Sequence, residues 1–235
     1  MSFASDVEAE VKRIFRQNWE TSKATTVPEP SDIALEKNEA KVIDDGTVLY
    51  ADLSGSTTMV QNRKPHFAAE VYRAYLYSAA QIIRNEGGVV TAYDGDRVMA
   101  VYLGKARNTS AATTALKINH AVKSIINPAI AAQYGTTNAY AAKQVVGIDR
   151  SALWIARTGV RGDNDLVWVG RAANYAAKLT EIANDDASFI TGEVFDRLAD
   201  SAKYKTGTTT PMWRERKWSQ MNDLRIYSSN WTWPL

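Results

Sequence analysis

The sequence predicts an α+β domain in which strands and helices follow the ferredoxin-like order β-α-β-β-α-β. Three observations lead to this fold class. An apolar run at residues 47–53 meets a turn and then a long helical pattern. An Asp94-Gly95 dipeptide, which suits a tight hairpin, separates two further strand-like runs. A second helical pattern then precedes more strand-like segments.

The 235 residues are enough for one large domain with small additions. We expect an N-terminal helix and linker over residues 1–45, the main domain over residues 46–200, and a C-terminal extension over residues 201–235 that packs on the core. Hydrophobic residues make up 45% of the chain and charged residues 23%, as in ordinary globular proteins.

The N-terminal segment predicts one helix and one connector. Ser5-Asp6-Val7-Glu8 has the form of a capping box, and apolar residues follow at helical spacing to about residue 19. Residues 21–46 are polar, contain Pro28 and Pro30, and end in Asp-Asp-Gly, which favours a connector with little regular structure.

The first half of the main domain continues with a strand, a turn and a helix. The strand at 47–53 ends at Ser54-Gly55, and the apolar face of the following helix ends at Gly87-Gly88. Strands at 89–93 and 97–102 flank the Asp94-Gly95 turn.

The second half is expected to repeat this alternation. Its predicted segments are a helix from about Thr109, strands at 144–148 and 152–160 with a polar turn at 149–151, a strand at 165–169, a helix at 170–182, a strand at 187–190, a helix at 193–202 and a hairpin from 212–218 and 223–228.

Composition excludes several classes of function. A formal net charge of +2 gives no basic coat for nucleic acid or acidic membrane. The absence of Cys removes disulfides and thiolate metal sites, and two histidines leave little room for zinc. No window approaches the length of a membrane span. We therefore expect a cytoplasmic protein with no nucleic-acid or membrane partner.

Two acidic residues stand where strand ends expose them. Asp52 lies near the end of the 47–53 strand, and Asp96 begins the return strand of the predicted hairpin. If these strands are neighbours, the two carboxylates meet and repel each other unless a hard cation such as Mg²⁺ or Mn²⁺ lies between them. The alternative is that both residues only form turns.

A third segment carries an amide and an ammonium group. On a helix over residues 170–182, Asn174 and Lys178 are four positions apart and project from one face, where a phosphate-bearing ligand could contact both. The alternative is an ordinary solvated polar pair.

Residues 49–57 (LYADLSGST), 88–100 (GVVTAYDGDRVMA) and 170–179 (GRAANYAAKL) together resemble the three signature blocks of the class III nucleotidyl cyclases, in order and at similar separations. The resemblance covers residues 47 to about 180. It implies a ferredoxin-like cyclase domain and head-to-tail homodimers with two equivalent sites between the subunits.

The resemblance also implies roles for the marked residues. Asp52, Asp96 and the backbone carbonyl of Leu53 would hold two divalent ions, Mn²⁺ or Mg²⁺, at each site. Asn174 of the other subunit would orient the ribose, and Lys178 would neutralise phosphate charge during attack of the ribose 3′-hydroxyl on the α-phosphorus. The family has arginine at the Lys178 position, so this chain keeps the charge and loses the bidentate fork.

The base-reading positions of the purine cyclases are apolar here. They are Ala92, four residues before Asp96, and Val167, seven before Asn174, and neither side chain can form a hydrogen bond. Tyr50 and Arg97 are therefore the candidate base contacts, although they could instead be a core aromatic and a surface strand residue.

This pattern resembles the stand-alone pyrimidine cyclases of the Pycsar anti-phage systems. Because arginine only donates hydrogen bonds, it suits the O4 acceptor of uracil better than the amino group of cytosine. The expected reaction is UTP to 3′,5′-cyclic UMP and diphosphate, as an antiviral signal for a cyclic-nucleotide-binding effector. The alternatives are a cytidylate cyclase that acts on CTP and a catalytically silent homologue that only binds nucleotide.

Overall fold

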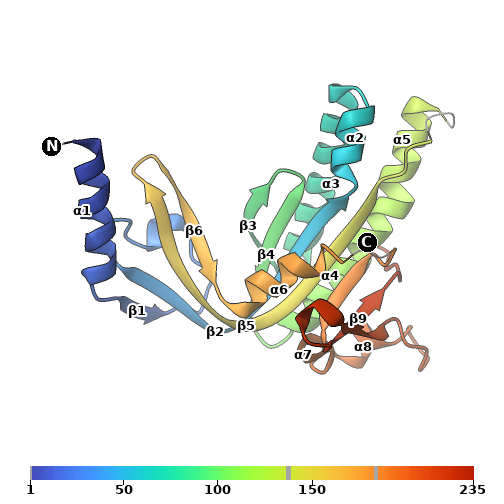
Figure 1. Cartoon of the computed structure of the whole chain (residues 1–235). Coiled ribbons are helices and arrows are strands. Elements are labelled where there is room, and N and C mark those ends of the chain that lie inside the picture. Colours follow the sequence, from blue (N-terminus) through green and yellow to red (C-terminus); the bar gives the residue numbers. More distant parts are fainter. Residues whose placement is uncertain (1, 136–138, 183–184) are drawn as a thin grey trace. The chain divides into compact units, whose positions relative to one another are not determined.

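The computed structural model describes residues 2–135, 139–182 and 185–235 (Figure 1). It divides into two compact units. Unit 1 comprises Met1–Asp45 and Ala152–Gly170, and unit 2 comprises Gly46–Ser151 and Arg171–Leu235. Two long strands, β2 (Glu39–Ser54) and β5 (Lys143–Val160), contribute residues to both units.

The sheet of unit 2 has the strand order β3-β4-β2-β5-β7-β9-β8. β3–β4, β4–β2, β7–β9 and β9–β8 pair antiparallel, whereas β5 and β7 pair parallel. The strands not yet defined are β3 (Val89–Asp94), β4 (Arg97–Tyr102), β7 (Ser188–Thr191), β8 (Arg214–Trp218) and β9 (Leu224–Ser229). Strands and helices alternate along the chain, which confirms the predicted α+β class.

The helices of unit 2 follow the strands along the chain. They are α2 (Ser56–Asn62), α3 (Pro65–Asn85), α4 (Arg107–Ala121), α5 (Asn127–Tyr134), α6 (Arg171–Leu179), α7 (Gly192–Phe195) and α8 (Asp200–Lys203). A π-helical turn over Val122–Ile126 joins α4 to α5. The predicted long helix after the first strand is split before Pro65, because proline is favoured at the first position of a helix.

Alternation along the strands separates two packed faces. Leu49, Ala51 and Leu53 of β2 join the main core with α3 and α4, and Val146 and Ile148 of β5 belong to the same cluster. Because successive side chains of a strand point to opposite faces, the residues between them face the other side. On that side α6 packs through Leu179 into a second cluster with Val145, Phe189, Trp218 and Ile226.

Unit 1 contains α1 (Phe3–Arg16), β1 (Glu20–Lys23) and β6 (Asp163–Val169). β1 pairs parallel with Glu39–Val42 of β2, and β6 pairs antiparallel with the second half of β5. α1 has no buried residue. Asn38 Nδ2 donates to the carbonyls of Ile14 and Gln17 at 2.7 and 2.8 Å and so satisfies the end of α1.

Several local predictions were wrong, and the single helix predicted at 193–202 is instead two short helices, α7 and α8. α1 begins earlier than the Ser5 capping box, because Ser2 Oγ accepts a hydrogen bond from the Ser5 amide. The predicted connector at 21–46 contains β1, a 3-10 turn and the start of β2, because backbone pairing there does not depend on apolar side chains. The predicted turn at 149–151 is part of continuous β5, because its polar side chains bond to other elements.

No helix of the described residues is both long and apolar enough to cross a bilayer.

Candidate active site

The end of β2 and the β3–β4 hairpin form one end of the unit 2 sheet. Asp52 pairs across the strands with Arg97, and Asp94 pairs with Arg97 on the other side. Asp96 stands in the hairpin turn beside Gly95, whose φ of 60° lies in the left-handed region that favours glycine. The strand pairing therefore sets Asp52 and Asp94 on either side of Arg97, with Asp96 in the adjacent turn.

Burial and neighbouring charges both act on the Asp52 carboxyl group. Burial raises the pKa of Asp52 from 3.8 to about 6, the charges of Asp96 and Asp94 act in the same direction, and Arg97 and the Leu53 backbone N–H oppose them. Arg97 Nε lies 3.7 Å from Asp52 Oδ1 and makes no hydrogen bond within the described residues. Asp52 therefore ionises reluctantly, as expected for a carboxyl group that lacks a full counter-charge.

The negative charges of Asp52 and Asp96 both act on the pKa of a buried phenol, that of Tyr75. Tyr75 of α3 is wholly buried, and no described residue hydrogen-bonds its hydroxyl. Burial raises its pKa well above 10, and the negative charges of Asp52 and Asp96 add to this effect.

These residues fit a divalent ion only in combination with a ligand. No three His, Cys, Asp or Glu side chains of the described chain gather as a metal-binding group. Hard divalent ions prefer carboxylate and carbonyl oxygens and often complete their shell with phosphate oxygens. Two partly buried, mutually repelling carboxylates, Asp52 and Asp96, match that donor set.

The candidate base contacts share a face with Asp52. Tyr50 precedes Asp52 by two residues on β2, and the register of β4 and β3 aligns Met99 and Ala92 with it, so Tyr50, Asp52, Arg97 and Ala92 all point away from α3. Burial raises the pKa of Tyr50, and Arg97 and Asp94 act on it in opposite directions. Val167 lies on β6 in unit 1 and is 41% exposed.

α6 carries the other two candidate residues on the same sheet face. Asn174 and Lys178 are exposed, and neither side chain makes a hydrogen bond or ion pair with any described residue. α6 packs against β5 and β7, whereas Asp52 and Asp96 belong to β2 and the β3–β4 turn. Its approach is close, since a Cβ on Gly147 would lie 2.1 Å from the Ala176 carbonyl oxygen.

The sequence analysis missed functional residues both around the Asp52–Asp96 pair and around α6. The sequence marks Asp94 only as a turn former, although its charge acts on the pKa values of Asp52 and Tyr50. It marks Asp149 only as part of a turn and Arg171 only as part of a signature block, although the two side chains bond to each other at the start of α6. The only sequence signal for these residues is that charged side chains flank the signature positions. Contacts between elements that are distant in the sequence leave no local pattern.

Comparison with known proteins places this geometry in a family. No family model matches the chain. Over all 235 residues, which is 100% of both chains, it is 51% identical to a uridylate cyclase of Burkholderia cepacia. It is 53% identical over 222 residues, 94% of each chain, to a uridylate cyclase of Xanthomonas perforans.

A solved structure shares the fold at lower identity. The adenylyl cyclase CyaB of P. aeruginosa superposes with a TM-score of 0.62, at 17% identity, over 81% of this chain and 95% of that one. The ferredoxin-like cyclase fold predicted from the three signature blocks is thereby confirmed. The chain is an enzyme of the class III nucleotidyl cyclases and belongs with the uridylate cyclases.

Proposed function

We propose that this cyclase converts UTP to 3′,5′-cyclic UMP and diphosphate. The observation that carries the proposal is the arrangement of Tyr50 and Arg97 on the same face as Asp52, in a chain 51% identical over its full length to a uridylate cyclase. Asp52, Asp96 and the Leu53 carbonyl are the proposed metal-binding groups, and Mn²⁺ or Mg²⁺ is the proposed cofactor.

The reaction is an intramolecular displacement. The ribose 3′-oxygen forms a bond to the α-phosphorus, the bond from that phosphorus to the bridging oxygen breaks, diphosphate leaves, and the hydroxyl proton is lost to solvent. When bound, divalent ions lower the pKa of the attacking hydroxyl and stabilise charge on the phosphates. Asn174 orients the ribose, and Lys178 places its positive charge against the charge that develops on the transferred phosphoryl group.

The proposed site lies between two copies of the chain. Asp52 and Asp96 belong to β2 and the hairpin turn, whereas Asn174 and Lys178 belong to α6, which rests on β5 and β7. A symmetric homodimer in which each copy presents one group to the other contains two such sites.

The proposed selection of uracil depends on the hydrogen-bond donors of Arg97. Arg97 Nε has no hydrogen-bond partner among the described residues, and the guanidinium offers donors only. Uracil O4 accepts such a bond, while the cytosine amino group does not. Ala92 and Val167 offer neither donor nor acceptor from their side chains, so the adenine contacts of purine cyclases are missing. CTP is the second candidate substrate.

The proposed biological role is a cytoplasmic anti-phage signal. It is supported by the resemblance of the three sequence blocks to the Pycsar pyrimidine cyclases. The product then acts on a separate cyclic-nucleotide-binding effector. Loss of protection against phage in cells that carry an Asp96→Asn chain, with protection by the unchanged chain, is the expected outcome.

Product identification tests the proposed function. The chain is incubated with each of the four nucleoside triphosphates and Mn²⁺ or Mg²⁺, and products are identified by mass spectrometry, with Asp96→Asn as the control. Cyclic UMP and diphosphate from UTP are expected. Cyclic CMP as the main product would favour the cytidylate alternative, and nucleotide binding without diphosphate release would favour a silent homologue.

A comparison of Arg97→Gln with the unchanged chain tests the base contact. Glutamine offers an acceptor as well as donors, so the ratio of kcat/KM for UTP to that for CTP should fall about tenfold. An unchanged ratio would remove Arg97 from base selection.

A further inference from the structure

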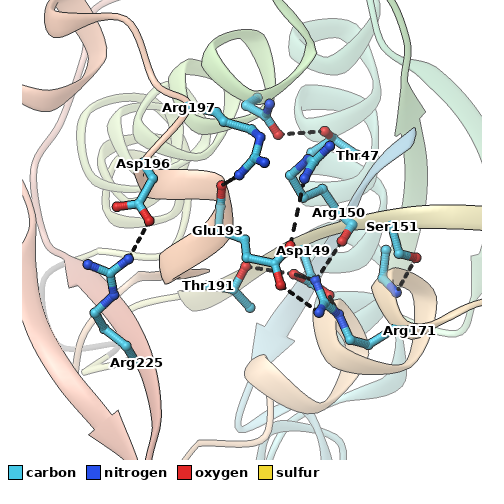
Figure 2. A network of polar contacts seen from close by, with 12 residues as sticks. Thr47, Asp149, Arg150, Ser151, Arg171, Thr191, Glu193, Asp196, Arg197 and Arg225 are labelled. Atoms are coloured by element: carbon cyan, nitrogen blue, oxygen red, sulfur yellow. Dashed lines mark hydrogen bonds and ion pairs between the residues drawn. The ribbon is translucent and has the colours of Figure 1, made fainter. Parts of the chain in front are cut away.

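A buried carboxylate lies beside the first turn of α6 (Figure 2). Asp149 of β5 is 0% exposed and accepts a 2.6 Å hydrogen bond from Thr191 Oγ1 at the end of β7. Arg171, the first residue of α6, donates to the same carboxylate from Nε at 3.0 Å and from Nη2 at 3.4 Å. A buried charge is costly unless it is paired and hydrogen-bonded, and Asp149 meets both conditions.

Every nitrogen atom of the Arg171 guanidinium makes a hydrogen bond, although the side chain is 38% exposed. Its Nη1 donates to Glu193 Oε1 of α7 at 2.7 Å, and its Nη2 donates to the Arg150 carbonyl at 2.8 Å. All three of its nitrogen atoms are therefore engaged with β5 or α7. The Tyr175 ring lies one helical turn further on, 5.6 Å from the guanidinium carbon. Such a planar fork fixes direction as well as distance, which a point charge or an apolar contact cannot do.

Further contacts fix α6 at its start and middle. Ser151 Oγ of β5 accepts the Ala172 amide hydrogen at 3.0 Å, which satisfies one of the free N–H groups at the helix start. Gly147, two residues before Asp149, lets the backbone of α6 come against β5. Side chains of the β5 segment Gly147–Ser151 thus set how α6 sits on the sheet.

Arg171 and the proposed catalytic pair share one side of the helix. Positions i, i+3 and i+7 fall close together around an α-helix, and Arg171, Asn174 and Lys178 have this spacing. The anchored arginine is therefore one turn before Asn174 and two turns before Lys178. Neither of those side chains has a partner of its own in the described chain, so the helix backbone alone directs them.

We propose that Asp149 and Arg171 are positioning residues for cyclisation, which hold α6 so that Asn174 and Lys178 meet the ribose and phosphates in a fixed direction. This inference rests on the proposed function of those two residues. A buried ion pair is weak evidence for stability, because apolar residues of similar volume often stabilise as well or better. A role in fixing orientation accounts for a fully buried carboxylate that is paired with a partly exposed arginine at this position.

Steady-state kinetics with Mn²⁺ and UTP, together with thermal unfolding, test the proposal on Asp149→Asn and Arg171→Lys. Since a misplacement of about 1 Å can cost about 100-fold in rate, we expect kcat to fall about 10- to 100-fold. KM should change less than about threefold, because Asp52, Asp96 and the base contacts belong to other strands. Arg171→Lys keeps the positive charge but loses the planar fork, and it tests the proposal even if Asp149→Asn does not fold.

Asp186→Asn is the matched control. Asp186 is likewise almost buried, and it accepts hydrogen bonds from Arg214 and Arg216 of β8 at 3.0 and 2.6 Å. Its loss should lower stability but leave kcat within about twofold of the unchanged chain. An equal fall in kcat for both acids would overturn the proposal, because it would reveal a general effect on folding.

A double-mutant cycle tests whether Asp149 acts through Asn174. In an Asn174→Ala background, Asp149→Asn should lower kcat by a smaller factor than it does in the unchanged chain, since one of the two groups that it positions has gone. Full additivity in kcat would overturn the proposal.

Hydrogen exchange provides a readout that needs no activity. Backbone amides of residues 171–179 should exchange faster in Asp149→Asn and Arg171→Lys, and at the unchanged rate in Asp186→Asn. Unchanged exchange in both α6-anchor variants would overturn the proposal. Absence of any cyclic nucleotide from the unchanged chain would instead contradict the proposed function, which this exchange measurement does not require.

Discussion

Replacing Asp52 by asparagine should stabilise the metal-free protein while abolishing its activity. The Asp52 side chain is 23% exposed, and burial together with Asp96 raises its pKa from 3.8 to about 6, even with Arg97 nearby. At about 1.4 kcal/mol for each tenfold change in the acid constant, this rise corresponds to at most about 3 kcal/mol. An ionised Asp52 therefore costs the folded state free energy that asparagine does not.

The upward direction of the Asp52 pKa shift defines the pH range in which stability changes. The folded chain binds the Asp52 proton more tightly than the unfolded chain, so this residue's contribution to stability is lost as pH rises from about 4 to about 6. The free energy of unfolding of Asp52→Asn minus that of the unchanged chain should therefore increase across this window. Above pH 6 we expect the variant to gain about 1 to 3 kcal/mol relative to its difference at pH 4.

Urea unfolding in EDTA at several pH values measures this difference, with Glu20→Gln on exposed β1 as the control. Mn²⁺ together with a UTP analogue that cannot cyclise should reverse the order at pH 7, because a ligand of the folded state stabilises only the chain that binds it. A difference that stays constant between pH 4 and pH 7 would refute the electrostatic reasoning, and an equal gain from Mn²⁺ and the analogue in both chains would refute the metal role of Asp52.

Two further substitutions test other parts of the site. Lys178→Arg gives the positive charge proposed to face phosphate a bidentate fork, so kcat for cyclic UMP formation should rise about 3- to 10-fold. An unchanged or lower kcat would contradict the proposed role of Lys178. Gly147→Ala places a Cβ 2.1 Å from the Ala176 carbonyl oxygen, so the free energy of unfolding in urea should fall by about 1 to 3 kcal/mol. Equal stability would mean that α6 does not pack closely on β5.

The convergence of Asp52 and Asp96 was predictable because its determinants are local. An apolar strand, a Ser-Gly turn and an Asp-Gly hairpin each leave a pattern in a few consecutive residues. Once β2 and β4 pair, the two-residue repeat of a strand places Tyr50 and Arg97 beside Asp52 without further information.

The anchoring of α6 was not predictable in the same way. Asp149, Arg150 and Ser151 have turn-like composition, and only contacts with α6, β7 and α7 show why they remain in a strand. β1 is likewise specified by parallel pairing with β2 rather than by its own exposed side chains. Such long-range pairing leaves no periodic signal in the residues that take part.

Mixing two inactive variants tests most directly whether the metal-binding carboxylates and α6 of different copies make one site. Asp96→Asn and Asn174→Ala chains are each assayed alone, then dissociated together and reassociated. Random pairing gives half mixed dimers, each with one intact site, so cyclic UMP formation should return to about a quarter of that of the unchanged chain. A mixture as inactive as its components, with dimers demonstrated in the same sample, would contradict the account.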